Sequence, residues 1–142
     1  MKSRSNIRQI IVHCTGSDRE QDDPIEVIRE WHLARGWDDI GYHLYIPKNF
    51  EKGIQMGRSL HTIGAHCLGQ NLDSVGICLS GNHEFHQHQL DTLVMAVQIL
   101  SAAFKIEKVF PHNFYNPGKT CPNFDIYDLP QLKQYEKARD AV

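Results

Sequence analysis

Short apolar, β-branched runs alternate with helical patterns along this chain of 142 residues. The runs that predict strands are residues 8–14, 41–46, 53–58, 74–80 and 108–110. Turn residues or proline close most of them, and helical segments lie between them. This alternation predicts an α/β fold in which one domain, residues 1–142, holds a central mixed β-sheet flanked by helices.

Two segments carry strong helix signals. Residues 23–26 read Asp-Pro-Ile-Glu, which predicts an N-cap, a proline in the first turn and a glutamate three residues after the cap. Gly36 is expected to end that helix. From Leu90 to Phe104 the apolar residues recur at 3.6 spacing on one face, the best amphipathic helix in the chain. Residues 130–142 are polar enough to predict a surface helix or a frayed tail.

Composition excludes several classes of protein. Hydrophobic residues make up 41% and charged residues 23%, as in globular proteins, and the net charge of -2 disfavours nucleic acid as the main partner. We find no secretory signal and no apolar stretch approaching the ~20 residues of a membrane span. We therefore expect a monomer, made in the cytoplasm, whose four cysteines stay reduced.

Three residues stand where they could form a metal site. His13 is at the end of the first predicted strand, and His112 and Cys121 flank a loop whose proline and glycine fold the chain back on itself. A catalytic zinc needs three such ligands and an open position for water. Alternation along the strand predicts that Cys14 faces the core if His13 faces a cleft. A hydrogen-bonded strand-end histidine and a free buried cysteine in a turn are the alternatives that spacing leaves open.

A second histidine-rich segment, residues 83–88, superficially resembles a zinc-protease helix. That motif requires histidines four apart with a glutamate beside the first, whereas His83 and His86 are three apart. We interpret the segment as a surface patch that binds metal at most adventitiously. The glycine-rich stretch 61–71 has no sustained period, which predicts an irregular loop of the kind that often carries function.

Five segments, in order, resemble the type 2 N-acetylmuramoyl-L-alanine amidases, a family that includes phage lysozyme-type amidases and peptidoglycan recognition proteins. They cover the chain from the first predicted strand to Asp125, and in combination they are far more specific than any one of them. The segments are Ile11-Val12-His13-Cys14-Thr15, Gly41-Tyr42-His43, residues 64–71, residues 75–81 and residues 117–125.

The resemblance implies a zinc-dependent enzyme that hydrolyses the lactyl amide between muramic acid and L-alanine in peptidoglycan. By matching position, it implies zinc ligands at His13, His112 and Cys121, catalytic partners at Tyr42 and Lys119, and substrate-binding residues at His66, Arg35, Trp37 and Arg58. Tyr42 would either deprotonate the water or orient it. Each residue also has an alternative interpretation. Tyr42 could be a strand aromatic and Lys119 a solvated lysine. His66 could brace the loop, Trp37 could be a partly exposed core residue, and Arg58 could be a surface charge.

Departures from the family pattern are few. Relatives commonly carry an acidic residue directly after the second histidine ligand, where this chain has Asn113-Phe114, so a carboxylate supporting the site is not expected there. The usual Arg-Pro before the loop histidine is Arg58-Ser59. Neither departure removes a ligand.

Two other classes compete with a lytic, phage-type enzyme. One is a peptidoglycan-binding module without catalysis, although such relatives tend to lose the cysteine ligand. The other is a structural zinc protein, for which Cys67 is the only nearby thiol that could close the site as a fourth ligand. Without a signal peptide, we expect an enzyme to reach the wall after lysis or by dedicated export, or to act on wall fragments in the cytoplasm.

Overall fold

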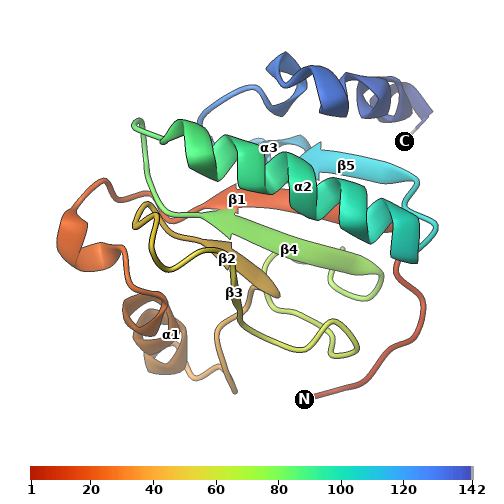
Figure 1. Cartoon of the computed structure of the whole chain (residues 1–142). Coiled ribbons are helices and arrows are strands. Elements are labelled where there is room, and N and C mark those ends of the chain that lie inside the picture. The colour runs from red at the N-terminus through yellow and green to blue at the C-terminus, as the bar shows by residue number, and fades with distance from the viewer. Residues whose placement is uncertain (142) are drawn as a thin grey trace.

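A five-stranded sheet with the strand order β3-β2-β4-β1-β5 forms the centre of the molecule (Figure 1). The computed structural model describes residues 1–141. The strands are β1 (Gln9–Cys14), β2 (Leu44–Ile46), β3 (Gln55–Met56), β4 (Ser74–Leu79) and β5 (Lys108–Pro111). Strand β1 is parallel to β4 and β5, β2 is parallel to β4, and β3 is antiparallel to β2. The predicted mixed sheet is confirmed.

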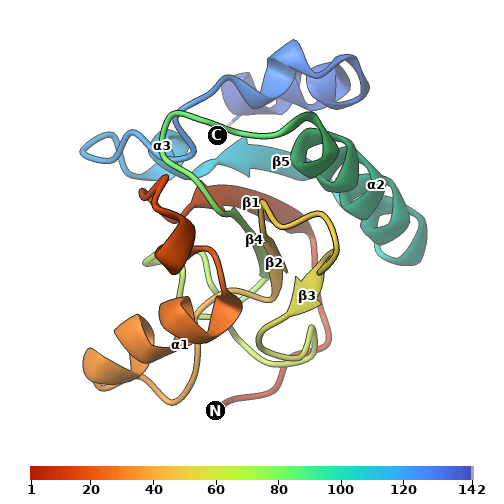
Figure 2. The same cartoon turned by 60° about the vertical axis from the view of Figure 1, so that its left-hand side comes forward.

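Helices cover both faces of the sheet. They are α1 (Ile25–Ala34), α2 (Gln87–Ala103), the single turn α3 (His112–Tyr115), and the 3-10 helices η1 (Glu20–Asp22), η2 (Ile126–Asp128) and η3 (Pro130–Ala141). Figures 1 and 2 show α2 and the C-terminal helix on one side of the sheet and α1 on the other. No helix within residues 1–141 is long and apolar enough to cross a membrane.

Alternation along the central strands divides the core in two. Ile10 and Val12 of β1 pack with α2 and η3 in the larger cluster, whereas Tyr45 and Cys78 pack with α1 in the smaller one. Because β1, β4 and β5 are parallel, their carboxyl ends meet at one edge of the sheet. Ligands of open α/β sheets bind at this edge, and His13 stands there opposite Cys78 in the register.

Strand β2 is shorter than predicted, beginning at Leu44 instead of Gly41. A Cβ on Gly41 would lie 2.0 Å from the carbonyl oxygen of Ala65, so the backbone of the neighbouring loop passes too close for any side chain. The amide of Ala65 also donates to the carbonyl of Gly41, at 3.0 Å. The loop therefore replaces regular strand structure at residues 41–43 and leaves Tyr42 just ahead of the strand.

The predicted N-cap of α1 was wrong, although the helix itself is present. The Asp23 carboxylate accepts the amides of Lys48 and Asn49, at 2.7 and 3.0 Å, and so ties the start of α1 to the end of β2. Asp23 therefore makes a tertiary contact in place of the helix cap that the local sequence pattern predicted. Gly36 ends α1 as predicted, with a φ of 86° that favours glycine.

The C-terminal helix η3 packs against the core. Leu132 is fully buried in the larger core cluster, and Tyr135 packs against the same cluster. The Tyr135 hydroxyl lies 3.0 Å from the hydroxyl of Ser101 on α2. A few apolar residues thus fix a segment whose overall composition is polar.

Candidate metal centre

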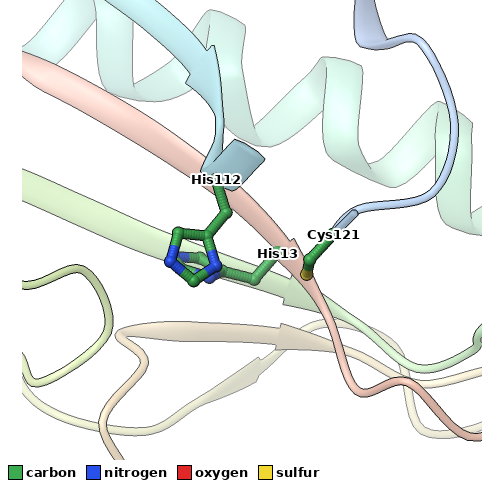
Figure 3. Close-up of side chains that lie close together, drawn as sticks. All are labelled: His13, His112 and Cys121. Atoms are coloured by element: carbon green, nitrogen blue, oxygen red, sulfur yellow. The ribbon is translucent and has the colours of Figure 1, made fainter. Parts of the chain in front are cut away.

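Three side chains from distant parts of the chain meet beyond the carboxyl end of β1. One potential ligand atom from each of His13, His112 and Cys121 lies within 4.8 Å of the others. Figure 3 shows the two imidazoles side by side and the thiol beside the end of β1, with His112 entering from the start of α3. The ring centroids of the two histidines are 4.4 Å apart. The structure thus brings together the three predicted ligands.

The set fits zinc in both chemistry and spacing. Two imidazoles and a thiolate are zinc ligands, and tetrahedral bonds of about 2.0–2.3 Å separate ligand atoms by about 3.3–3.8 Å. Small side-chain shifts would bring atoms now within 4.8 Å to that separation. Within residues 1–141 no fourth histidine, cysteine or carboxylate belongs to the group, so Cys67 does not close it. Among the described residues, the group therefore offers three protein ligands to a metal.

Electrostatics keep both imidazoles neutral, which is the form that binds a metal. Burial lowers the pKa of His13 well below its usual value, and neighbouring histidines lower it further. Burial also lowers the pKa of His112, and the ammonium of Lys119 adds to that effect. Metal binding therefore displaces no proton from either ring at neutral pH.

Cys14 is buried, as predicted, but its thiol contacts the cysteine of the ligand group and belongs to neither core cluster. Its thiol lies 3.4 Å from the Cys121 sulfur, and its backbone amide donates to that sulfur at 2.7 Å. The hydrogen bond with the Cys14 thiol and burial both raise the pKa of Cys121. Without a metal this thiol holds its proton, so a bound cation must displace that proton while the Cys14 amide stabilises the thiolate. The loop carrying Cys121 folds over the strand end, which simple alternation could not predict.

The loop between the second and third ligands is braced by Asn113. Its backbone amide donates to the carbonyl of Cys121 at 3.0 Å, and its side-chain amide donates to the carbonyl of Thr120 at 3.3 Å. Phe114 packs on Phe110 of β5, with ring centroids 4.6 Å apart. The two residues that depart from the family pattern therefore fix the loop directly, with no carboxylate.

Tyr42 and Lys119 both line the cleft that holds the ligand group. The tyrosine ring lies 5.0 Å from the His13 ring, and burial raises the pKa of its hydroxyl well above the ordinary value. Tyr42 is therefore a neutral hydrogen-bonding group at physiological pH. Lys119 is exposed on the braced loop, two residues before Cys121, so a cation lies on the solvent side of the cleft.

The cleft has a volume of about 580 Å³ and extends from the ligand group toward the end of α1. Arg35 and Trp37 line it, and the guanidinium of Arg35 lies 5.3 Å from the centre of the tryptophan ring. Leu68 lines it too and is 98% exposed. Sequence reasoning missed Leu68, because nothing local distinguishes it from the other apolar residues of the glycine-rich loop.

Two predicted substrate-binding residues are buried. His66 reaches the cleft, but its ring is hydrogen-bonded to His13, with 2.8 Å between Nδ1 of His66 and Nε2 of His13. Arg58 is outside the cleft lining, and its guanidinium donates to the carbonyls of Ile40 and Ile63, at 2.8 and 2.9 Å. It joins the segment that carries Tyr42 to the loop that carries His66.

Arg4, like Arg58, holds the loop that carries His66. Its guanidinium donates to the carbonyls of Leu60, Asn71 and Leu72, at 3.0, 3.0 and 3.3 Å, and to the carbonyl of Ser74. A buried arginine without a carboxylate partner satisfies its donors only because this many carbonyls converge on it. The N-terminal segment is thus part of the support of the site.

The histidine-rich segment before α2 serves the fold. His88 lies 2.7 Å, through Nε2, from the carbonyl of Lys48 and stacks edge-on against Phe50. The amide of His86 donates to the side chain of Gln89 at the start of the helix, at 2.8 Å. Within the described residues, none of these histidines belongs to a potential metal-binding group.

Comparison with known proteins agrees with this geometry. The family described as N-acetylmuramoyl-L-alanine amidase matches residues 3–124. The endolysin of Enterobacteria phage T3 is 31% identical over 133 residues, which cover 88% of this chain and 86% of the relative. The endolysin of Klebsiella phage KP32 is 33% identical over 131 residues, covering 87% and 85%.

A solved structure gives the same answer. The N-acetylmuramoyl-L-alanine amidase LysC from Clostridium intestinale URNW superposes with a TM-score of 0.77 at 26% identity, covering 91% of this chain and 85% of that one. Fold and site define an α/β protein with a potential mononuclear metal centre at the carboxyl edge of its sheet. The chain belongs to the N-acetylmuramoyl-L-alanine amidase family.

Proposed function

We propose that this chain is a zinc-dependent amidase that hydrolyses the lactyl amide between muramic acid and L-alanine in peptidoglycan. The observation that carries the proposal is the meeting of His13, His112 and Cys121 in a cleft that Tyr42 and Lys119 also line. Two imidazoles and one thiolate hold the zinc and leave one position open. Bound zinc supplies a Lewis acid that lowers the pKa of water to about 7.

The residues around the ligands supply the rest of the chemistry. As water adds to the amide carbonyl, negative charge grows on the carbonyl oxygen, and the ammonium of Lys119 can approach from the solvent side to stabilise it. Tyr42 keeps its proton because burial raises its pKa, so we assign it to orienting the attacking water and donating to the oxyanion. The amide bond then breaks, and the L-alanine nitrogen leaves as an amine after taking up a proton.

The cleft wall beyond the metal offers a place for the glycan and stem peptide. Arg35, stacked on Trp37, presents a cation beside an aromatic surface, which suits the carboxylates and aliphatic parts of a peptidoglycan stem. Arg58 is held by backbone carbonyls, so we assign it to shaping the wall and not to touching substrate. We assign His66 to orienting the His13 ring through their hydrogen bond.

The endolysin relatives support a lytic role of the phage or prophage type. We expect such an enzyme to act on the wall after lysis or dedicated export, or on wall fragments in the cytoplasm, and we expect no nucleic-acid partner. We expect it to act as a monomer, because one chain contributes every member of the ligand group.

Mass analysis of digested peptidoglycan tests the proposal. The full chain, loaded with zinc, is incubated with purified wall, and we expect new muramic lactyl carboxylates and new L-alanine amines in equal amounts. Chelated protein and Cys121→Ser should release neither, whereas His83→Gln, which alters an exposed histidine outside the cleft, should match the wild type. Equal release by chelated and zinc-loaded protein would exclude a zinc mechanism. Zinc binding near zero, with wall binding retained, would support the non-catalytic module instead.

A further inference from the structure

Behind the metal centre, a chain of hydrogen bonds runs from β1 to the backbone of the loop before β4. Nε2 of His13 lies 2.8 Å from Nδ1 of His66. Nε2 of His66 lies 3.1 Å from the hydroxyl oxygen of Ser74, and that hydroxyl donates to the carbonyl of Gln70 at 2.6 Å. All three side chains are buried.

The direction of every bond in this chain follows from its last member. A carbonyl oxygen can only accept, so the single hydroxyl proton of Ser74 is committed to Gln70. Ser74 must then accept from His66, which places the His66 proton on Nε2 and leaves Nδ1 as an acceptor. His13 therefore donates from Nε2, and its Nδ1 is the nitrogen that keeps a lone pair.

The His66 ring has no room to adopt another arrangement. A Cβ on Gly76 would lie 2.6 Å from the ring, and a Cβ on Gly64 would lie 2.8 Å from it, so the ring fits only because both neighbours are glycine. Asn71 fixes the backbone beneath the ring by accepting the amides of His66 and Cys67, at 3.0 and 2.9 Å. The ring is thus fixed from both sides and from its own backbone.

We propose that Ser74 is a positioning residue for the metal centre: through His66 it sets the tautomer of His13, so that Nδ1 faces the metal with its lone pair. The inference rests on the proposed role of His13 as a zinc ligand. Metal-binding histidines in general donate their other ring proton to a partner that fixes ring orientation and tautomer. Here that partner is a second histidine whose own tautomer is set by a serine hydroxyl and a backbone carbonyl.

Nitrogen NMR of the imidazoles tests the bond directions without relying on any activity. In the full chain labelled with ¹⁵N and freed of metal by a chelator, we expect both His13 and His66 to carry their proton on Nε2, with Nδ1 at the shift of an unprotonated nitrogen. A proton on Nδ1 of either ring would overturn the proposal. This measurement uses the wild-type chain and does not depend on a variant folding.

A pair of matched serine variants tests the consequence for the metal. Ser74→Ala removes the acceptor for His66, and we expect zinc affinity, measured by competition with a chromophoric chelator, to fall about 10- to 100-fold. The control is Ser80→Ala, a buried serine just after the same strand, β4, which should bind zinc as the wild type does. Ser74→Thr, which keeps a hydroxyl, should restore the affinity and both tautomers. If Ser74→Ala and Ser80→Ala bind zinc equally well, Ser74 has no positioning role.

These outcomes separate this inference from the proposed function. Predicted tautomers in a chain that does not cut the wall amide would leave the hydrogen-bond chain standing and remove the amidase proposal. Amide cleavage by a chain whose His13 is protonated on Nδ1 would do the reverse.

Discussion

The two sides of the metal centre are built in opposite ways. His13 stands at the end of a central strand, with its ring buried and hydrogen-bonded to a second buried ring. His112 and Cys121 belong to a partly exposed segment that is held by turns, by Asn113 and by the packing of Phe114. The strand side fixes geometry, and the loop side brings charge and access to solvent. A hydrolytic site needs rigid ligands to hold the metal, and it needs an open side through which substrate can enter.

Removing a ligand from either side should have the largest effect. His13→Asn and His112→Asn each leave two ligands, and we expect zinc binding to be lost and amide release to fall by well over about 100-fold, beyond the effect of losing an outer partner. The rigid side should differ in one respect: His13→Asn breaks the bond to His66 and so lowers the free energy of unfolding of the chelated protein, whereas His112→Asn should barely change it. Calorimetry with and without chelator measures this difference. Equal destabilisation by both variants would contradict the distinction between the two sides.

Substituting Lys119 measures what the loop side contributes to catalysis. Lys119→Ala removes a cation that can reach the developing oxyanion, so kcat should fall about 100-fold or more while zinc affinity stays near that of the wild type. Because the side chain is exposed, thermal stability should not change. Lys105→Ala, at an exposed lysine outside the cleft, is the matched control and should retain full activity. An unchanged kcat in Lys119→Ala would remove this residue from the mechanism.

Acid should weaken the strand side through its buried histidines. Burial lowers the pKa of His43 to about 4, and burial also lowers the pKa of His66 well below its usual value. A lowered folded-state pKa means that the unfolded chain binds protons first, so this stability is complete above pH ~6.5 and is lost as the pH falls toward 4. We expect each such group to contribute a slope of up to about 1.4 kcal/mol per pH unit in that window.

Denaturant titrations of chelated protein between pH 7 and pH 4 measure that slope. In His43→Gln the slope of the unfolding free energy against pH should decrease by the contribution of one proton. In His83→Gln, at an exposed position, the slope should stay as in the wild type. A flat stability profile across the window would show that the buried histidines do not resist protonation.

The brace at Asn113 should give the smallest effect. Asn113→Asp keeps the backbone bond to Cys121 but replaces the donor to Thr120 with a second acceptor, which removes one hydrogen bond worth about 0.5–1.5 kcal/mol. We expect zinc affinity to fall only a few-fold, with kcat nearly unchanged once zinc saturates the site. Asn6→Asp, far along the chain from the loop, serves as the charge-matched control. If Asn113→Asp lost as much zinc affinity as a ligand variant, the position of the loop would depend on Asn113 far more than these two hydrogen bonds indicate.

Sequence reasoning reached the strand side and the ligand set but not the contacts between them. The β-branched run before His13 predicted its strand, because a buried parallel strand has a strong local signature. The resemblance supplied His112 and Cys121 with Tyr42 and Lys119. Cys14 is buried as predicted, but its contact with Cys121 was not predicted, because it depends on a loop more than a hundred residues away along the chain.

The same limit applies to the charged residues. Asp23 was taken as a cap from a strong local motif, yet a tertiary contact with Lys48 and Asn49 claimed its carboxylate. The resemblance placed Arg58 in the substrate groove, and nothing local in the sequence shows that backbone carbonyls surround its guanidinium. The strands and helices follow from local patterns, whereas the contacts of these two polar side chains with distant backbone do not.

The contacts of Arg4 have a practical consequence for handling the protein. The amide of Ile63 donates to the carbonyl of Lys2 at 2.8 Å, and Ser3 pairs with Thr62, so losing the first three residues would already loosen the loop that carries His66. Losing Arg4 as well would release four carbonyls around that loop. Preparations that retain different numbers of these residues should therefore differ in specific activity. Batch-to-batch variation in specific activity should follow intact mass at that end.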